Sequence, residues 1–547
     1  MNDTPVSPTQ SEAASPDIKL AFVCDCEERA RSACQGQPFF KELEGKRYCV
    51  LHYPDTDKLE AFRLALKRKL DAQDFDFQEV WFPESVSFEK FEFSALANFG
   101  GSKFSALANF YGSKFSADAN FSNAMFSAGA DFSSAMFSAG VGFLDSQFNG
   151  VANFSGSQFS GVAYFYGSQF SADANFSFST FGAAANFIRS RFSAFTNFIG
   201  SKFSADANFE SATFSADANF SSAMFSAKVG FNTVTFGTNA YFRGLTFSAD
   251  TGFNSTIFSA DADFSGSMFR ALANFSFSMF SANADFSRSV FSADASFSFS
   301  TFKNYVSFAG SNEKKAFGKQ TRIDFQHAHI EKPERVSFHT VNLRPYWFIN
   351  TDCRKFEFVD CFMSYNLKKD VLGAMGAGIN WPYRLLAITY RQLADNAEAN
   401  HRYHEASRFR FSGFEVRRIE RFRGIVPWQL DWWYWLASGY GESVRRALFV
   451  FLTLLALFAF TYGWVGFDQS GRAMTASVSQ IKSQPDTAGK PLNWKDAYLY
   501  SVGVSILQKP DPKPLTRTAK FLVYLQTILG PAQAALLALA VRRKFMR

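Results

Sequence analysis

The chain has 547 residues and a formal net charge of +7, so it is long enough for several domains and only modestly basic. Hydrophobic residues make up 47% of it and aromatic residues 18%, but one phenylalanine-rich stretch inflates both figures, and they exclude no fold class by themselves. No basic segment followed by an apolar run opens the sequence, so a secretory signal is not expected. A reducing compartment is therefore predicted, and structural disulfides are disfavoured.

Residues 1–20 are rich in Ser, Pro, Thr, Asp and Ala and are predicted to form a disordered tail. The next segment, 21–55, concentrates the side chains that bind zinc: Cys24, Cys26, Cys34, Cys49 and His52. Four such ligands suit tetrahedral zinc, and the last two are spaced as on one turn. The predicted set is Cys34, Cys49, His52 and either Cys24 or Cys26. A group of reduced structural cysteines in a small domain is the alternative.

Residues 56–74 place apolar side chains at helical spacing with basic residues between them: Leu59, Phe62, Leu64, Ala65 and Leu70. A short helix is expected here. It would cap the repeated stretch that follows, because the terminal turn of a repeat structure needs protection.

The dominant feature is phenylalanine at fixed spacing between Phe93 and Phe308. One series recurs at every eleventh residue from Phe93 to Phe302, and a second, six residues later, runs from Phe99 to Phe308. A fixed short period indicates a solenoid, and gaps of six and five residues do not fit a helix. Side chains alternate along strands, so each phenylalanine and the small residue two positions before it should point inward. Asn, Asp, Lys, Gln, Ser or Met should point outward.

A typical unit, from Phe214 to Met224, reads Phe-Ser-Ala-Asp-Ala-Asn-Phe-Ser-Ser-Ala-Met. Such units resemble the Phe-rich variant of the pentapeptide-repeat family, and the resemblance covers about 75–365. It implies a right-handed quadrilateral β-helix, a β-solenoid with four short faces per coil and two eleven-residue units per coil. The stretch from Glu44 to His52 is similar to short Cys/His knuckles that precede some bacterial members of this family.

After Phe308 the phase is lost, and the polar residues 311–322 are expected to loop out. A period of five follows, whose members should point inward: Phe338, Leu343, Phe348, Cys353 and Phe358. Cys353 is therefore predicted to be a core residue and not a ligand. Cys361 lies outside this series.

From 366 to 443 the composition turns helical, and one helix is expected from Tyr383 to Arg423. His401 and His404 would lie three residues apart on it as solvated surface residues. Tryptophans beside the arginines of this segment are typical of a membrane–water interface: Trp428, Trp432, Trp433 and Trp435. The segment resembles the linker between solenoid and membrane part in membrane-bound pentapeptide-repeat proteins.

The final segment, 444–547, contains two uncharged apolar runs at 447–466 and 521–541, each long enough to span a bilayer. Arg445 and Arg446 precede the first run, and further basic residues follow the second. The positive-inside rule therefore predicts a two-helix hairpin in the inner membrane, with both chain ends and the solenoid in the cytoplasm and the loop outside. The Gly-Pro pair within the second run predicts a kink.

Between the two runs, residues 494–507 are predicted to form a short re-entrant helix. Its Asp-Ala-x-x-x-Ser pattern and the two flanking spans resemble the two-helix pore domain of potassium-type channels. The pore-loop-like positions are Ser501, Gly503, Ser505 and Gln508. A potassium filter needs backbone carbonyls of a Thr-Val-Gly-Tyr-Gly-like segment, where this chain has Gln-Lys-Pro-Asp-Pro. The resemblance therefore implies common architecture without potassium selectivity, and an anchor hairpin with an outside cap is the alternative.

The residues offer no convergent acid, base and nucleophile, so an enzyme is not expected. Between Phe93 and Phe308 there are 12 acidic and 10 basic residues, a balance of −2 that is too weak to imitate a nucleic-acid backbone. The predicted function is a non-catalytic, membrane-anchored scaffold that presents a rigid cytoplasmic solenoid to a protein partner and self-associates through the hairpin. The alternative is an oligomeric ion channel with a degenerate pore loop, regulated by the solenoid.

Overall fold

A computed structural model describes the following parts of the chain: 22–310, 316–318, 321–363, 366–376, 378–421, 430–467 and 491–545. The predicted tail, most of the predicted polar loop, and Trp428 lie outside these residues. Two compact units divide the chain, Met1–Asn274 and Phe275–Arg547, and the division falls inside the phenylalanine repeat.

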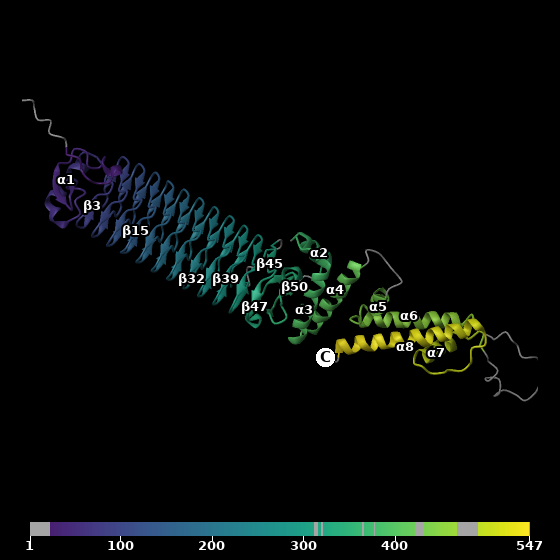
Figure 1. Cartoon of the computed structure of the whole chain (residues 1–547). Helices are drawn as coiled ribbons and strands as arrows, with labels where there is room; N and C mark the ends of the chain where they lie inside the picture. The colour runs from purple at the N-terminus through teal and green to yellow at the C-terminus, as the bar shows by residue number, and fades with distance from the viewer. Residues whose placement is uncertain are drawn as a thin grey trace, which may run out of the picture. The chain divides into compact units, whose positions relative to one another are not determined.

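A small cap opens the first unit (Figure 1). Strands β1 (Phe39–Leu43) and β2 (Lys46–Cys49) pair antiparallel, and two 3-10 turns, η1 (Glu28–Ala30) and η2 (Thr56–Lys58), flank them. Helix α1 (Leu59–Asp71) follows, within the range where a helix was expected. On α1, Phe62 packs edge to face against Phe82 of the first coil with ring centroids 5.5 Å apart, so the helix covers the end of the stack.

Two lysines of this cap are buried, which the helical pattern did not indicate. Lys58 Nζ donates to the carbonyl of Leu51 at 2.7 Å, and Lys69 Nζ donates to that of Ala33 at 3.2 Å. Desolvation lowers the pKa of Lys58 to about 7. Leu64, in contrast, is exposed on the outer face of α1.

Each coil of the solenoid consists of four two-residue strands joined by tight corners. One coil comprises β27 (Thr213–Phe214), β28 (Ala218–Asn219), β29 (Met224–Phe225) and β30 (Val229–Gly230). Strands pair in parallel with their counterparts one coil later, and thus Phe214 pairs with Phe236 of β31 (Thr235–Phe236). Two eleven-residue units per coil are thereby confirmed. The longest sheet has 13 strands, which corresponds to about 13 coils.

The interior is filled by stacked phenylalanine rings. Phe220 is fully buried and stacks in parallel with Phe198 and Phe242, with centroids 4.9 and 5.2 Å apart. It also meets Phe209 and Phe231 edge to face at 5.6 and 5.3 Å. Both geometries are favoured for aromatic pairs. The rings of neighbouring coils therefore form continuous columns.

The predicted alternation of inward and outward side chains is confirmed. Ala218 and Ala223 are buried beside the rings, whereas Met224 is exposed and Asn219 half-buried. Several inward positions hold serine instead of alanine, and their hydroxyls bond to the backbone of the preceding coil. For example, Ser201 Oγ donates to the carbonyl of Phe176 at 2.7 Å. A satisfied buried hydroxyl of this kind contributes about 1 kcal/mol to stability.

In the second unit the strands of one face become longer before the solenoid ends. Strands β44 (Val306–Ala309), β47 (Val336–His339) and β49 (Glu357–Val359) continue one face in parallel, and β48 (Asn342–Leu343) pairs with β50 (Phe362–Met363). Every member of the predicted five-residue series is buried, and Phe338 stacks between Phe308 and Phe358. The assignment of Cys353 to the core is confirmed, and Cys361 is only partly buried.

The single helix expected from Tyr383 to Arg423 is wrong. The chain instead forms α2 (Leu367–Gly376), α3 (Pro382–Ala399) and α4 (Tyr403–Arg421), and α3 packs along α4. The reversal lies at His401, whose φ of 58° is left-handed. Asn400 Nδ2 donates to the carbonyl of Asn396 at 2.9 Å, and Arg402 N donates to that of Ala397 at 2.7 Å. These bonds close the end of α3 as a helix C-cap does.

Asn396 on α3 seals the end of the solenoid. Its Nδ2 donates to the carbonyls of Cys353, Arg354 and Phe356 at 3.2, 2.9 and 2.7 Å. Its Oδ1 accepts from Arg402 at 2.9 Å. The last coil has no further strand whose amides could donate to its backbone carbonyls. The buried side-chain amide of Asn396 donates to them instead, and carbonyls left buried without a donor would lower the free energy of unfolding.

Asp370 on α2 is a buried carboxyl group with an incomplete set of partners. Tyr390 Oη donates to its Oδ2 at 2.7 Å, whereas Oδ1 has no hydrogen-bond partner. Burial raises the pKa of Asp370 to about 7, and the bond from Tyr390 only partly offsets this effect. Below about pH 7 the carboxyl group therefore takes up a proton on folding.

This burial predicts a pH dependence of local stability. Between about pH 4 and pH 7 the unfolded state holds the ionised group while the folded state holds the proton, so the free energy of unfolding falls as pH rises. Amide exchange in α2 and α3, corrected for the intrinsic rates, should show lower protection near pH 7 than near pH 5. Asp370→Asn should remove this slope, and Tyr390→Phe should extend it to higher pH. An unchanged slope in Asp370→Asn would contradict the assignment.

Four more helices follow among the described residues of the second unit: α5 (Leu430–Ser438), α6 (Val444–Tyr462), α7 (Trp494–Ser505) and α8 (Arg517–Phe545). Helices α6 and α8 lie side by side with α7 against them (Figure 1). Helix α8 runs through Gly530 and Pro531 without ending.

Candidate metal centre and membrane hairpin

Three cysteines and one histidine of the cap converge. The ligand atoms of Cys24, Cys34, Cys49 and His52 all lie within 4.8 Å of one another. Cys49 ends β2, and His52 follows in the turn where the amides of His52 and Tyr53 donate to the Cys49 carbonyl. The amide of Asp25 donates to the carbonyl of Arg47 on β2 at 2.8 Å, so the segment that carries Cys24 lies against the strand that ends at Cys49.

The orientation of His52 is set by a contact outside the cluster. Its Nε2 lies 3.0 Å from the carbonyl oxygen of Gln78, which can only accept, so Nε2 carries the hydrogen. The other nitrogen, Nδ1, faces Cys49 Sγ at 3.2 Å and Cys24 Sγ at 3.9 Å. Metal-binding histidines are commonly held in this way by a carbonyl on the second nitrogen.

The electrostatics of the cluster favour a thiolate. Hydrogen bonds from Cys34 and Cys49 hold the pKa of Cys24 well below its usual range. The amide of Cys49 also donates to Cys24 Sγ at 3.3 Å. Burial opposes a charge on His52, but its hydrogen bonds to Cys24 and Cys49 prevail and raise its pKa to about 10. Without a metal, His52 therefore keeps its proton beside the Cys24 thiolate, and a bound metal ion would replace that proton.

The position of Cys26 separates the two options that the sequence left open. Its Sγ lies 3.7 Å from Cys34 Sγ, but it is not one of the four mutually close ligands. The pKa of Cys26 is raised to about 12, mainly because burial disfavours the charged thiolate. The structure thus groups Cys24, and not Cys26, with the other three predicted ligands.

Three sulfurs and one imidazole nitrogen within 4.8 Å of one another match the donor set of a tetrahedral zinc site. Zinc bond lengths require sulfur–sulfur edges of about 3.8 Å and sulfur–nitrogen edges of about 3.5 Å. The two sulfur–nitrogen distances at His52, 3.2 and 3.9 Å, bracket the second value. A Cys3His cluster that could bind a metal is therefore present in the cap.

Two helices are long and apolar enough to cross a membrane. They are α6, over Val444–Tyr462, and α8, over Arg517–Lys544, and only 22% and 17% of their most apolar windows are buried. Large apolar side chains such as Phe449, Leu457 and Phe521 are exposed. A core helix of a soluble protein would bury most of this surface.

Helix α7 is held between α6 and α8 by buried polar contacts around Gln526. Gln526 Nε2 donates to the carbonyl of Ser501 at 2.8 Å and to the hydroxyls of Ser501 and Ser505 at 2.6 and 3.0 Å. Its Oε1 accepts from Tyr462 at 2.5 Å, and Ser501 Oγ in turn donates to the carbonyl of Leu455. All three helices are therefore joined through one amide.

Of the pore-loop-like residues, Ser501 and Ser505 are buried between the helices, Gly503 is buried beside Pro510, and Gln508 is exposed. A Cβ at Gly530 would lie 2.5 Å from Ser505 Oγ, so α8 needs glycine there to approach α7. Gln526 was not predicted from the sequence. An uncharged but strongly polar residue inside an apolar run was the available signal.

The charged ends of the hairpin meet. The Glu442 carboxylate, before α6, pairs with Arg410 of α4 and Arg543 near the end of α8, both at 3.0 Å. Its side chain is only 3% exposed. Gln533 Nε2 of α8 donates to the carbonyls of Ala437 and Ala447 at 2.7 and 2.9 Å. The start of α6 and the end of α8 therefore lie at the same level.

Comparison with known proteins finds one family that matches part of the solenoid. Residues 132–180 and 143–191 match the family described as pentapeptide repeats (9 copies). No curated protein matches the chain, and no solved structure does. The matched residues lie inside the continuous register of coils, in which Phe137 pairs with Phe159 and Phe159 with Phe181. Residues 132–191 of the phenylalanine-rich solenoid are therefore similar to pentapeptide repeats.

Proposed function

We propose that the chain is a membrane-anchored scaffold whose solenoid offers a rigid surface to a cytoplasmic protein partner. The observation that carries this proposal is the exposed apolar surface of α6 and α8, which water would disfavour and lipid would cover. Pentapeptide-repeat solenoids generally serve as structural or interaction modules. The outward half-buried asparagines and serines offer hydrogen-bonding groups without a convergent catalytic set.

The orientation follows from the charges at the joined ends of the hairpin. Arg445 and Arg446 begin α6, and Arg542, Arg543 and Lys544 end α8, at the level where Glu442 pairs with both sides. We propose that this end of the hairpin, where α6 starts and α8 ends, faces the cytoplasm, and that the solenoid and the metal cap are on the cytoplasmic side too. The loop between α6 and α7 then faces outside.

Cysteine labelling of intact cells with an impermeant reagent tests this arrangement. Ser483→Cys should label, because Ser483, which lies outside the described residues, falls between the two apolar runs in the sequence. Lys368→Cys, exposed on α2, should label only after the cells are opened. The unmodified chain supplies the background of its six native cysteines. Labelling of Lys368→Cys alone in intact cells would reverse the orientation, and labelling of neither would argue for a soluble fold.

The Cys3His cluster is proposed to hold one zinc ion through Cys24, Cys34, Cys49 and His52. When bound, zinc would cross-link the cap, whose hydrophobic core is small. The backbone carbonyl of Gln78, in the first coil, accepts a hydrogen bond from His52 and so orients this ligand. The cap would then stay docked on the open end of the solenoid through the Phe62–Phe82 contact.

One observation favours a second candidate, an ion channel. Helix α7 is short and packs between two spanning helices, as a pore helix does in potassium-type channels. A pore needs several copies around one axis, so the hairpin would have to self-associate. Single-channel recording of the purified chain in planar bilayers separates the candidates. Steps of reproducible conductance would favour the channel. The anchor is favoured if no conductance is recorded from a protein that floats with lipid vesicles and labels at Ser483→Cys as expected.

A further inference from the structure

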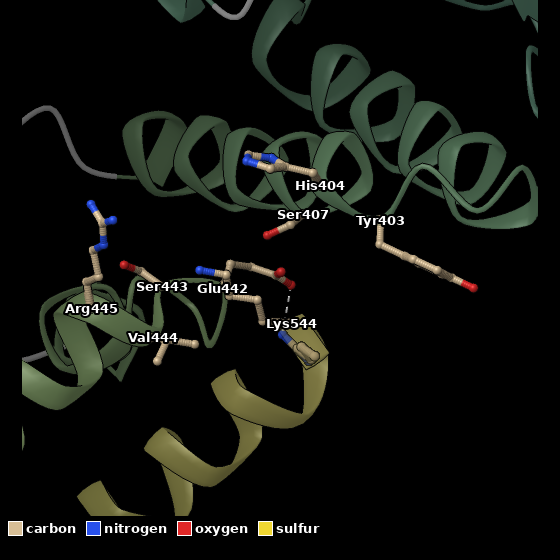
Figure 2. Close-up of a pocket in the computed structure, with 9 residues that line it drawn as sticks. Tyr403, His404, Ser407, Glu442, Ser443, Val444, Arg445 and Lys544 are labelled. Atoms are coloured by element: carbon tan, nitrogen blue, oxygen red, sulfur yellow. Dashed lines mark hydrogen bonds and ion pairs between the residues drawn. The ribbon is translucent and has the colours of Figure 1, made fainter. Parts of the chain in front are cut away.

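We propose that a basic pocket at the base of the hairpin binds the phosphate of an anionic phospholipid headgroup. This inference rests on the proposed membrane anchoring. The pocket encloses about 280 Å³ between α4, the start of α6 and the end of α8. Figure 2 shows its lining side chains, which come from all three elements. The volume corresponds to several water molecules, enough for one phosphate group.

The charge of the pocket is positive. Arg445, Arg543 and Lys544 line it, together with His404, Ser407 and the single carboxylate of Glu442. That carboxylate is already paired with two arginines and is almost fully buried. Arginine and lysine with a nearby hydroxyl are the donors that phosphate oxygens accept from most strongly. An anion would therefore enter a site whose own acid is already neutralised.

The pocket lies where the exposed apolar surface of the hairpin stops. On α6, exposed Leu448 and Phe449 follow Arg445 within one turn, about 5–6 Å along the axis. On α8, exposed Val541 is followed at once by Arg542. Both helices thus change from lipid-compatible to charged surface at the level of the pocket. Phospholipid phosphates lie at this boundary.

The exposed side chains of helix α5 also indicate that the membrane interface lies at the level of the pocket. Leu430, Trp433 and Leu436 recur at three-residue spacing and are 87%, 54% and 37% exposed, so one face of α5 is apolar and uncovered within the described residues. Such a face is typical of a helix lying in the membrane interface. Arg446 packs over the ring of Trp435, with 4.8 Å to the centroid, and donates to its carbonyl. The aromatic helix and the basic pocket are therefore adjacent parts of one interface.

A matched pair of charge-removing variants tests the pocket. Arg445→Gln with Lys544→Gln removes two lining cations and leaves the Glu442–Arg543 pair intact. Arg417→Gln with Arg542→Gln removes two exposed cations from the same helices, α4 and α8, outside the pocket. Native mass spectrometry of the full chain in detergent micelles, titrated with short-chain phosphatidylglycerol, measures lipid retention. The pocket variant should lose at least about tenfold in affinity, and the control less than about twofold.

Three results would overturn the proposal. Equal weakening in both variants would indicate diffuse attraction. Equal binding of phosphatidylcholine would exclude recognition of headgroup charge. Displacement of the lipid by inorganic phosphate at equal concentration would indicate a site for the free ion. Flotation with vesicles of phosphatidylcholine and phosphatidylglycerol tests the anchor separately. A chain that stays unfloated while it retains selective lipid binding would refute the anchor and keep the pocket.

Discussion

Phe220→Ala is expected to destabilise the middle of the solenoid by about 3–5 kcal/mol, because it removes a fully buried ring and leaves a cavity. The ring contacts five others above, below and beside it, so neighbouring coils lose their packing as well. Repeat proteins are stabilised mainly by such contacts between neighbours. The damage should therefore concentrate in the adjacent coils and fade toward the caps.

Native-state amide exchange of the full chain measures this effect. Amides of the coils between Phe198 and Phe242 should exchange at least about a hundredfold faster in Phe220→Ala. Asn219→Ala is the matched control, since the two positions are adjacent and Asn219 is half-buried. Its Oδ1 accepts one bond from the amide of Ser221 at 3.0 Å, so its loss should cost only about 1 kcal/mol. Equal effects of the two changes would contradict the inward and outward assignment.

The second large effect is expected at the cap. Full-chain protein purified under reducing conditions should carry about one zinc per chain, and Cys49→Ser should lose it. Cys24→Ser should lose it too, whereas Cys26→Ser should retain it, because only Cys24 belongs to the converging set. Elemental analysis gives the zinc content. Loss of the ion should also expose α1 and the first coil to exchange, since structural zinc contributes directly to folding.

The cysteine pair provides the control for this experiment. Cys24 and Cys26 are two residues apart and differ mainly in their distance from Cys49 and His52. Less than about 0.2 zinc per wild-type chain would contradict the zinc site and favour the alternative, in which the cap holds reduced structural cysteines without a metal. A Cys26→Ser protein as depleted as Cys24→Ser would show that the ligand set is wrong.

Several features of this protein were determined by the sequence alone. The solenoid was predictable because a period of eleven with gaps of six and five admits only short strands with Phe220 and its equivalents inside. The two apolar helices were predictable because a long uncharged run leaves few alternatives. The burial of Cys353 followed from the five-residue phase. In each case a local pattern repeats often enough, or runs long enough, to override single exceptions.

Other features depended on contacts between residues that are distant in sequence. The choice of Cys24 over Cys26 depends on where β2 ends, since either residue satisfies the spacing. The chain reverses at His401, and α4 packs back along α3. The helical spacing of apolar residues in the sequence does not show such a reversal. Gln526 and Glu442 looked like isolated polar residues, and only the packing of α8 against α7 and α4 gives them partners. A polar group is stable in a buried place only when its partners are already positioned there, and the tertiary structure alone places them.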